Sequence, residues 1–165
     1  MITAIGQGTL TTTPLQMARF AAAIANGGKV LIPQLLANTG PEIANEPEIK
    51  PEHLKHIQNA MRSVVLNPRG TAHRVLSSLP WKTAGKTGTA QVVKMSQDDD
   101  KIGFEKKDLL KRHKDHAWFM GYAPYENPKI AIAVFVEHGG HGGSDAAPVA
   151  AAIIRSMAAQ QPVAP

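Results

Sequence analysis

The sequence predicts an α+β domain, an antiparallel sheet of three strands packed with helices. Segments near the start, in the middle and at the end of the chain carry apolar residues at helical spacing. Three strand candidates follow one another in the second half, and a turn rich in Pro and Asn joins the last two. Because strands joined by short turns pair antiparallel and the helical segments lie apart from them, we expect two or three layers.

The first helix is expected within TTTPLQMARFAAAIANGG, residues 11–28. Thr13 can cap it, Pro14 suits the first helical position, and Asn26 with the two following glycines can end it. Apolar residues cover two faces of this segment, so the pattern predicts a helix packed on several sides. The next segment, KVLIPQLL at 29–36, is typical of a short extended piece, and its proline suggests an edge or a bend.

A second helix is expected over PEHLKHIQNAMRSVVL, residues 51–66. Its apolar side chains recur at helical spacing, and Asn67 and Pro68 follow as a stop signal. The pattern predicts an amphipathic helix of about four turns. The apolar face consists of Leu54, Ile57, Met61, Val64 and Val65.

Three strands are expected at 81–93, 117–123 and 129–137. The turn PYENP at 124–128 joins the second strand to the third and predicts an antiparallel hairpin. Between the first and second strands, segment 94–115 holds 13 charged residues among 22, with nearly balanced signs. We interpret this segment as a mobile, solvated insertion rather than a binding patch, because its charges alternate in sign.

The last helix is expected over SDAAPVAAAIIRSMAAQ, residues 144–160. Ser144 or Asp145 can cap its start, because a short polar side chain there can accept a hydrogen bond from the first turn. The remaining residues, 161–165, read as a frayed tail.

The composition excludes several classes of protein. The formal charge is +5, but the basic residues are spread along the chain, so we expect no nucleic acid as a partner. The absence of cysteine rules out disulfides and thiolate metal sites, and we expect neither a metal nor a cofactor. The longest apolar runs, such as IAIAVFV at 130–136, are far shorter than the ~20 residues of a membrane helix. We also expect no signal peptide within this chain.

The glycine-rich stretch EHGGHGGSDA, residues 137–146, resembles two kinds of site but is interpreted as a loop. His138 and His141 could bind a metal, but the sequence offers no definite third ligand. Ser144 could lie in a nucleophile elbow, but Ala146 stands where that pattern needs glycine. A plain connection between strand and helix fits the stretch better than either kind of site.

The stretch TAGKTGT at 83–89 interrupts a strand with an ammonium, a hydroxyl and a glycine. A phosphate loop is excluded, because Pro80 takes the place of its first glycine and β-like residues follow. In a strand, Lys86 and Gly88 share one face while Thr87 and its neighbour at 89 share the other, although a local twist could bring Thr87 toward a ligand.

Two interpretations of this strand stay open from the residues alone. The functional one is a strand at the edge of a cleft, where glycine lets a peptide backbone approach and free N–H groups act as oxyanion donors. The other is an ordinary strand with a surface lysine and a bulge glycine.

Four blocks of sequence resemble the class B penicillin-binding proteins. They are KTAGKTGTAQ at 82–91, IGQGTLTTTPLQMA at 5–18, RGTA at 69–72 and AWFMGYAPYENPKIAIAVFVEHGG at 117–140. They occur in the order of that family and span nearly the whole chain. The long insertion and the EHGG ending are most similar to the elongation-type penicillin-binding protein 2. The resemblance implies part of the fold shared by penicillin-binding proteins and serine β-lactamases.

This resemblance implies a role for each residue of the strand. Lys86 would supply positive charge and hydrogen bonding near the nucleophile, and Thr87 would bind the carboxylate of a peptidoglycan stem peptide or of a β-lactam. Gly88 would leave room for the peptide, and the Thr89 N–H would be half of the oxyanion hole. Gln91 would help to shape the same strand edge.

The sequence departs from the family because no S-x-x-K and no S-x-N occurs in residues 1–165. We therefore expect the chain to be the C-terminal portion of a transpeptidase domain that is inactive alone, with the nucleophile in a missing N-terminal half. The parent would lie at the periplasmic face of the inner membrane and work with the cell-elongation machinery. The uncovered strand 130–136 is an expected site for self-association or for docking of that missing half.

Two other functions stay open. The chain could be a non-catalytic binding module that keeps the fold and presents a partner surface. A class A β-lactamase or carboxypeptidase fits less well, because GQG, TPLQMA and AWFMGYAP are more similar to class B.

Overall fold

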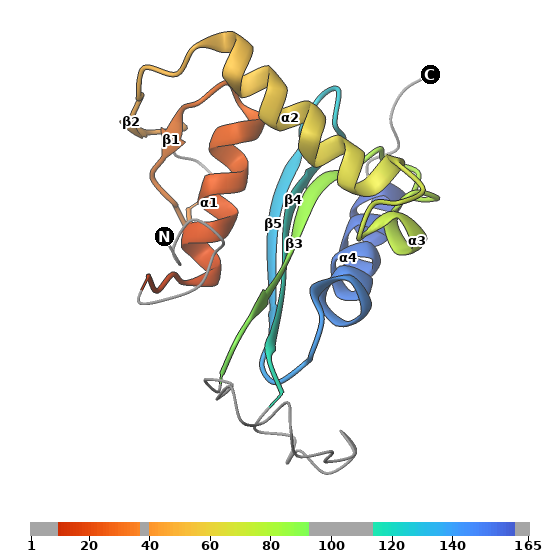
Figure 1. Cartoon of the computed structure of the whole chain (residues 1–165). Helices are drawn as coiled ribbons and strands as arrows, with labels where there is room; N and C mark the ends of the chain where they lie inside the picture. The colour runs from red at the N-terminus through yellow and green to blue at the C-terminus, as the bar shows by residue number, and fades with distance from the viewer. Residues whose placement is uncertain (1–9, 37–39, 93–113, 161–165) are drawn as a thin grey trace, which may run out of the picture.

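The computed structural model describes residues 10–36, 40–92 and 114–160, which form three layers. Figure 1 shows the central sheet between α1 on one side and α3 with α4 on the other, while α2 runs across one end of the sheet. The predicted α+β class is therefore confirmed, with three layers. The sheet consists of β3 (Ala84–Ala90), β4 (His116–Ala123) and β5 (Ile130–Val136).

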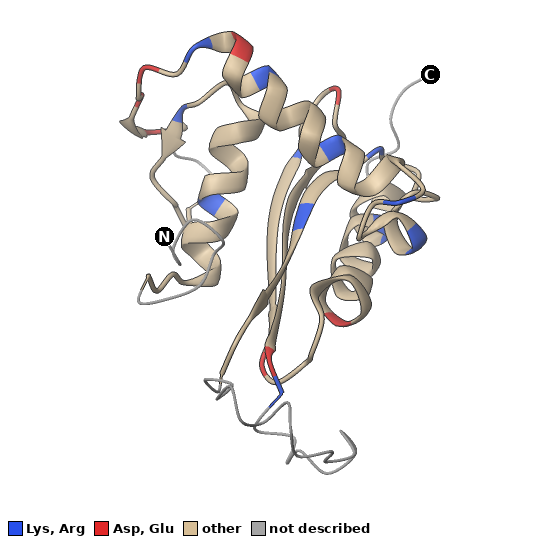
Figure 2. Ribbon diagram, viewed as in Figure 1, with Lys and Arg blue, Asp and Glu red and all other residues tan. Residues whose placement is uncertain are grey.

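The three strands pair antiparallel in the order β3-β4-β5, as the sequence predicts. The first strand is shorter than the predicted 81–93: it begins at Ala84, after the Lys82 carbonyl has accepted a hydrogen bond of 2.6 Å from the Tyr125 N–H in the turn, and it ends at Ala90, while position 93 lies outside the described residues. In the register, Lys86 lies opposite Met120 and Gly88 opposite Trp118. Within the bounds of the three strands, Lys86 is the one residue among Lys, Arg, Asp and Glu. Figure 2 colours the position of such residues along the ribbon.

Helix α1 (Pro14–Ala25) begins and ends where the sequence predicts. Thr13 and Gln16 form a reciprocal capping box, with the Thr13 N–H donating to Gln16 Oε1 at 2.8 Å and the Gln16 N–H to Thr13 Oγ1 at 3.2 Å. Within the described residues α1 contacts β4 and β5 of the sheet, strand β1 and helix α2, so the expectation of packing on several sides is confirmed in part. Leu15 and Phe20 are 60% and 54% exposed, because only one face of α1 meets the sheet.

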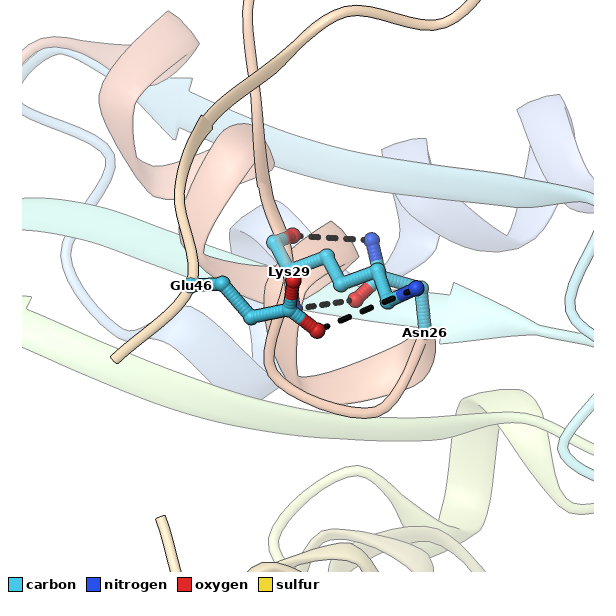
Figure 3. A network of polar contacts seen from close by, with 3 residues as sticks. All are labelled: Asn26, Lys29 and Glu46. Atoms are coloured by element: carbon cyan, nitrogen blue, oxygen red, sulfur yellow. Dashed lines mark hydrogen bonds and ion pairs between the residues drawn. The ribbon is translucent and has the colours of Figure 1, made fainter. Parts of the chain in front are cut away.

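A small two-stranded ribbon follows α1. Strand β1 (Val30–Leu31) confirms the predicted extended piece, and it pairs with β2 (Ile43–Asn45), which the sequence did not indicate. Figure 3 shows how the ribbon joins the end of α1. Asn26 exchanges two hydrogen bonds of 2.9 Å with the Lys29 backbone, and Lys29 Nζ lies 3.8 Å from Glu46 Oε1. This exposed ion pair adds little stability.

Helix α2 (Pro51–Leu66) has the predicted bounds and ends at Asn67. The connection to the short helix α3 (His73–Leu76) folds back on the last turn of α2. There the Ala72 N–H donates to Val64 O at 3.2 Å. Gly70 is required in this connection, because a Cβ on it would lie 2.2 Å from Val64 O.

The last helix begins later than predicted, and a π-helical turn precedes it. A π-helical turn η3 (Gly142–Ala146) leads into α4 (Ala147–Gln160). Ser144 and Asp145 therefore lie inside the turn, and the expectation that either caps the helix is wrong. The Asp145 carboxylate instead accepts from the His141 N–H at 3.1 Å and from Ser144 Oγ at 2.5 Å. The hydrogen bond from Ser144 is the largest cause that lowers the pKa of Asp145, and the bond from the His141 backbone lowers it further.

The core has two parts, one on each face of the sheet. The larger part lies between the sheet and α4. The smaller part joins α1 and α2 to the other face through Ile24, Leu54, Met61, Ala84 and Tyr122. Among the described helices, none is long and apolar enough to cross a membrane. The predicted insertion 94–115 lies outside the described residues apart from its last two positions, and so does the tail 161–165.

The Tyr122 side chain places a hydroxyl group inside the smaller part of the core. Tyr122 is 1% exposed, and its hydroxyl has no hydrogen-bond partner in the part of the chain that the structure describes. Burial, followed by the charge of Tyr125, raises its pKa from 10.0 to about 12. We expect Tyr122→Phe to leave stability at pH 7 equal or increase it by up to about 2 kcal/mol, because an unpaired buried hydroxyl is costly.

Urea unfolding at pH 7 and at pH 11 checks this prediction. A pKa that is higher in the folded state gives stability that is present below the unfolded pKa and lost as the pH rises toward 12. The wild type should therefore lose more stability than Tyr122→Phe over that range. Tyr125→Phe is the matched control, because it removes a bond of 2.8 Å to Asn59 and should not stabilise. A Tyr122→Phe variant that unfolds more readily than wild type at pH 7 would contradict the prediction.

Candidate active-site strand

Four of the five predicted site residues, Lys86 to Thr89, lie together in the middle of β3, which is an edge strand of the described sheet. Successive side chains of a strand point to opposite faces of the sheet, so Gly88 and Thr87 belong to different faces. A Cβ on Gly88 would lie 3.1 Å from Trp118 Cβ, on the face of the sheet that turns toward α1. Thr87 turns the opposite way and meets Thr71, which precedes α3.

A cavity of about 520 Å³ lies between β3 and β4 and the chain around the start of α1. Lys86, Thr87, Gly88 and Thr89 all line it. The facing walls are mainly apolar, with Trp118 among the residues that form them. A cavity with apolar walls and a few polar groups from one strand suits an extended ligand that pairs with the strand.

Lys86 places the only cation of the three strands at this cavity. Its side chain is exposed, and Nζ donates to the Thr87 carbonyl at 2.6 Å. The ammonium therefore lies along the strand near its polar backbone groups. It can attract a carboxylate or a developing negative charge on a ligand in the cavity.

The two threonines and Gln91 differ in their surroundings. Thr87 is 9% exposed, and its Oγ1 lies 2.7 Å from Thr71 Oγ1. Thr89 is half-buried and has an interaction partner, and it lies opposite Ala117 in the register. Gln91 is exposed and follows the last residue of β3, so it lies beside the predicted cluster rather than within it.

The turn η3 supports the strand from behind, a contact that sequence reasoning missed. A Cβ on Gly142 would lie 2.3 Å from Trp118 O and 2.6 Å from Gly88 O. A Cβ on Gly143 would lie 2.5 Å from Thr71 O. The stretch was interpreted as a plain loop, although its paired glycines could have signalled a close backbone approach.

The alternatives that were weighed for this stretch do not gain support from the geometry. His138 Nδ1 lies 3.1 Å from the Lys114 carbonyl, and within the described ranges no three His, Cys, Asp or Glu side chains converge as metal ligands. Ser144 Oγ donates to the Asp145 carboxylate next to it. A carboxylate neighbour of this kind does not form the hydroxyl–imidazole pair of an activated serine.

The described structure thus has helices on both faces of an antiparallel sheet, with Lys-Thr-Gly on an edge strand beside a cavity. The family model of the penicillin binding protein transpeptidase domain matches residues 1–155. The chain therefore belongs to the penicillin-binding protein transpeptidase domain family, and the predicted resemblance is confirmed.

Several curated relatives and solved structures are similar to the chain. The peptidoglycan D,D-transpeptidase MrdA of Haemophilus influenzae is 36% identical over 88% of the chain and 24% of the relative. The MrdA of Acinetobacter baumannii is 39% identical over 86% of the chain and 22% of the relative. The chain thus spans about a quarter of the length of these relatives.

The solved structures agree with the sequence relatives. A penicillin-binding protein (PBP2) from Helicobacter pylori superposes with a TM-score of 0.78 at 29% identity, over 98% of this chain and 27% of that one. Pseudomonas aeruginosa PBP2 in complex with WCK 5153 gives 0.69 at 34% identity, over 98% of this chain and 32% of that one. The similarity to elongation-type relatives extends over nearly the whole chain.

Gly142 of η3 packs directly against the backbone of the sheet. We expect Gly142→Ala to destabilise the protein by about 1–3 kcal/mol, because the added methyl group would collide with the backbone of Gly88 and Trp118. Thermal unfolding measures the effect. Gly40→Ala is the matched control and should be nearly neutral, since no atom of the described residues beyond its chain neighbours lies within 4 Å of its added Cβ. Equal effects of the two substitutions would show that η3 does not press on the strand.

Proposed function

We propose that this chain supplies the strand edge and half of the oxyanion hole of a peptidoglycan D,D-transpeptidase. In that reaction a serine Oγ attacks the carbonyl between the two D-alanines of a stem peptide, and its proton passes to a base. The peptide bond breaks, D-Ala leaves with a proton, and an amine of a neighbouring strand then takes the acyl group from the serine. The observation that carries the proposal is the position of Lys86–Thr89 along one wall of the cavity.

Each residue of the strand has a chemical task in this proposal. Lys86 holds positive charge close to the nucleophile, and the Thr87 hydroxyl donates to the carboxylate of the stem peptide or of a β-lactam. Gly88 leaves space for the peptide backbone, and the Thr89 N–H donates to the developing oxyanion. Gln91 shapes the strand edge just beyond β3.

The nucleophile belongs to a different part of the proposed enzyme, because residues 1–165 contain no S-x-x-K and no S-x-N. We propose that the chain is the C-terminal portion of the transpeptidase domain and is inactive alone. The missing half would bring the serine, its lysine and the second hydroxyl to the cavity. Acyl transfer needs the nucleophile, the proton relay and the oxyanion hole together.

The free edge of β5 is the proposed contact with that missing half. In the described sheet β5 pairs with β4 alone, and its Phe135 is 39% exposed. Helix α1, which contacts β5, also exposes Leu15 and Phe20. An uncovered strand edge flanked by apolar side chains is a surface on which another segment can pair.

The setting of the parent is inferred from its relatives. One solved relative is a complex between a penicillin-binding protein (PBP2) and MreC from Helicobacter pylori, which supports a partner in the cell-elongation machinery. We propose that the parent acts at the periplasmic face of the inner membrane, where peptidoglycan is assembled.

Labelling with a fluorescent penicillin tests the proposed active site. We expect no label on this chain alone, and label on the separately expressed N-terminal half when the two are mixed. Lys86→Met should slow labelling of the mixture by about 100-fold or more, because it removes the positive charge close to the nucleophile.

Lys82→Met is the matched control, since Lys82 is an exposed lysine that precedes β3. It should label at the wild-type rate. Label on this chain alone would contradict the assignment of the nucleophile to the other half. Equal rates for both lysine variants would contradict the role of Lys86.

Light scattering tests the proposed docking edge. We expect the chain alone to form concentration-dependent dimers or larger species, and a one-to-one complex when the N-terminal half is added. Phe135→Lys should weaken both forms of association, because it places a charge among the apolar residues beside the edge. A chain that stays strictly monomeric at high concentration would contradict self-association through 130–136.

A further inference from the structure

Thr87 is one of two buried polar or charged residues among those that the structure describes. The two residues satisfy their hydroxyl groups in different ways. The other, Thr83, donates to the Trp81 carbonyl two residues away, which satisfies it locally. Thr87 instead meets a side chain 16 positions away in sequence, the hydroxyl of Thr71 at 2.7 Å. A contact of this length between two hydroxyl groups is a well-formed hydrogen bond.

We propose that Thr71 is a positioning residue that holds the Thr87 hydroxyl in the orientation needed to bind a ligand carboxylate. This inference rests on the proposed function and adds a residue to it. A hydroxyl has one proton and two acceptor sites. If Thr71 donates to Thr87, the proton of Thr87 stays available and its oxygen is fixed. A carboxylate accepts hydrogen bonds only, so this is the direction that its recognition requires.

The backbone around Thr71 is held on two sides, so the Thr71 side chain keeps its position beside Thr87. On one side, the N–H groups at 70 and 72 donate to Asn67 O at 2.7 Å and Val64 O at 3.2 Å, which ties the connection to the end of α2. On the other side, the Thr71 carbonyl faces Gly143 of η3, where a Cβ would lie only 2.5 Å away. Thr71 therefore has little room to move away from Thr87.

Solvent access is consistent with such a role. Thr71 is exposed whereas Thr87 is 9% exposed, so the pair lies at the boundary between the layer behind β3 and open solvent. Thr87 also lines the cavity that holds Lys86. The Thr87 side chain turns away from the α1 face, but β3 is an edge strand of the described sheet, so a ligand that lies along this edge can reach the Thr87 hydroxyl, whose other side is occupied by Thr71.

Two variants of Thr71 separate positioning from simple packing. Thr71→Val keeps the shape of the side chain and removes the hydroxyl, whereas Thr71→Ser keeps the hydroxyl. We expect the T71V mixture of the two halves to label with penicillin about three- to tenfold more slowly, the value of one hydrogen bond, and T71S to restore the rate. In a Thr87→Val background the T71V substitution should have no further effect.

A measurement on the chain alone decides the inference independently of activity. Three-bond NMR couplings of the Thr87 side chain report its χ1 rotamer, which should be single in the wild type and in T71S and averaged in T71V. A Thr87 rotamer that is unchanged in T71V would overturn the inference, whatever the labelling rates are. If the wild-type mixture fails to label while the rotamer shifts as expected, the proposed function fails and the positioning role of Thr71 stands.

Discussion

The register between β3 and β4 is the constraint on which the site depends. Side chains alternate along a strand, so a slip of one residue would exchange the faces that Lys86 and Thr87 occupy. Two backbone contacts keep this register: Gly88 lies opposite Trp118, and Gly142 of η3 presses on that same pair from behind. Contacts between the backbones of β3, β4 and η3 thus fix which face each side chain of the strand occupies.

The two faces of the sheet are packed differently, and the cavity results from this asymmetry. Behind the sheet, α4 presents small residues that allow a close approach, and Ala147 and Ala150 are fully buried there. On the front, α1 meets the sheet along one face only and leaves Leu15 and Phe20 exposed. A rigid rear layer and an open front layer let the strand stay fixed while a ligand, or another part of the protein, occupies the space before it.

Much of the fold could be predicted from the sequence, because strong local signals set it. Proline and capping signals gave α1 and α2, and the turn at 124–128 gave the hairpin. Strand β2 was missed because its three residues are extended only through pairing with β1. The grouping of Lys86 to Thr89 was also predictable, since strand periodicity and family resemblance agree. The partners of this group were not, because Thr71 and η3 are distant in sequence from β3, and no local pattern records that proximity.

The glycines behind the strand also limit how such a protein can change its sequence. At Gly142 and Gly143 even a methyl group meets backbone atoms, which cannot rotate away as a side chain can. Substitutions at these two positions are therefore expected to be rare in a protein that keeps this packing. Change in the shape of the cavity is easier at its other walls, where the flexible side chains of Met17 and Met120 can be exchanged for others of similar size without moving the backbone of the strand.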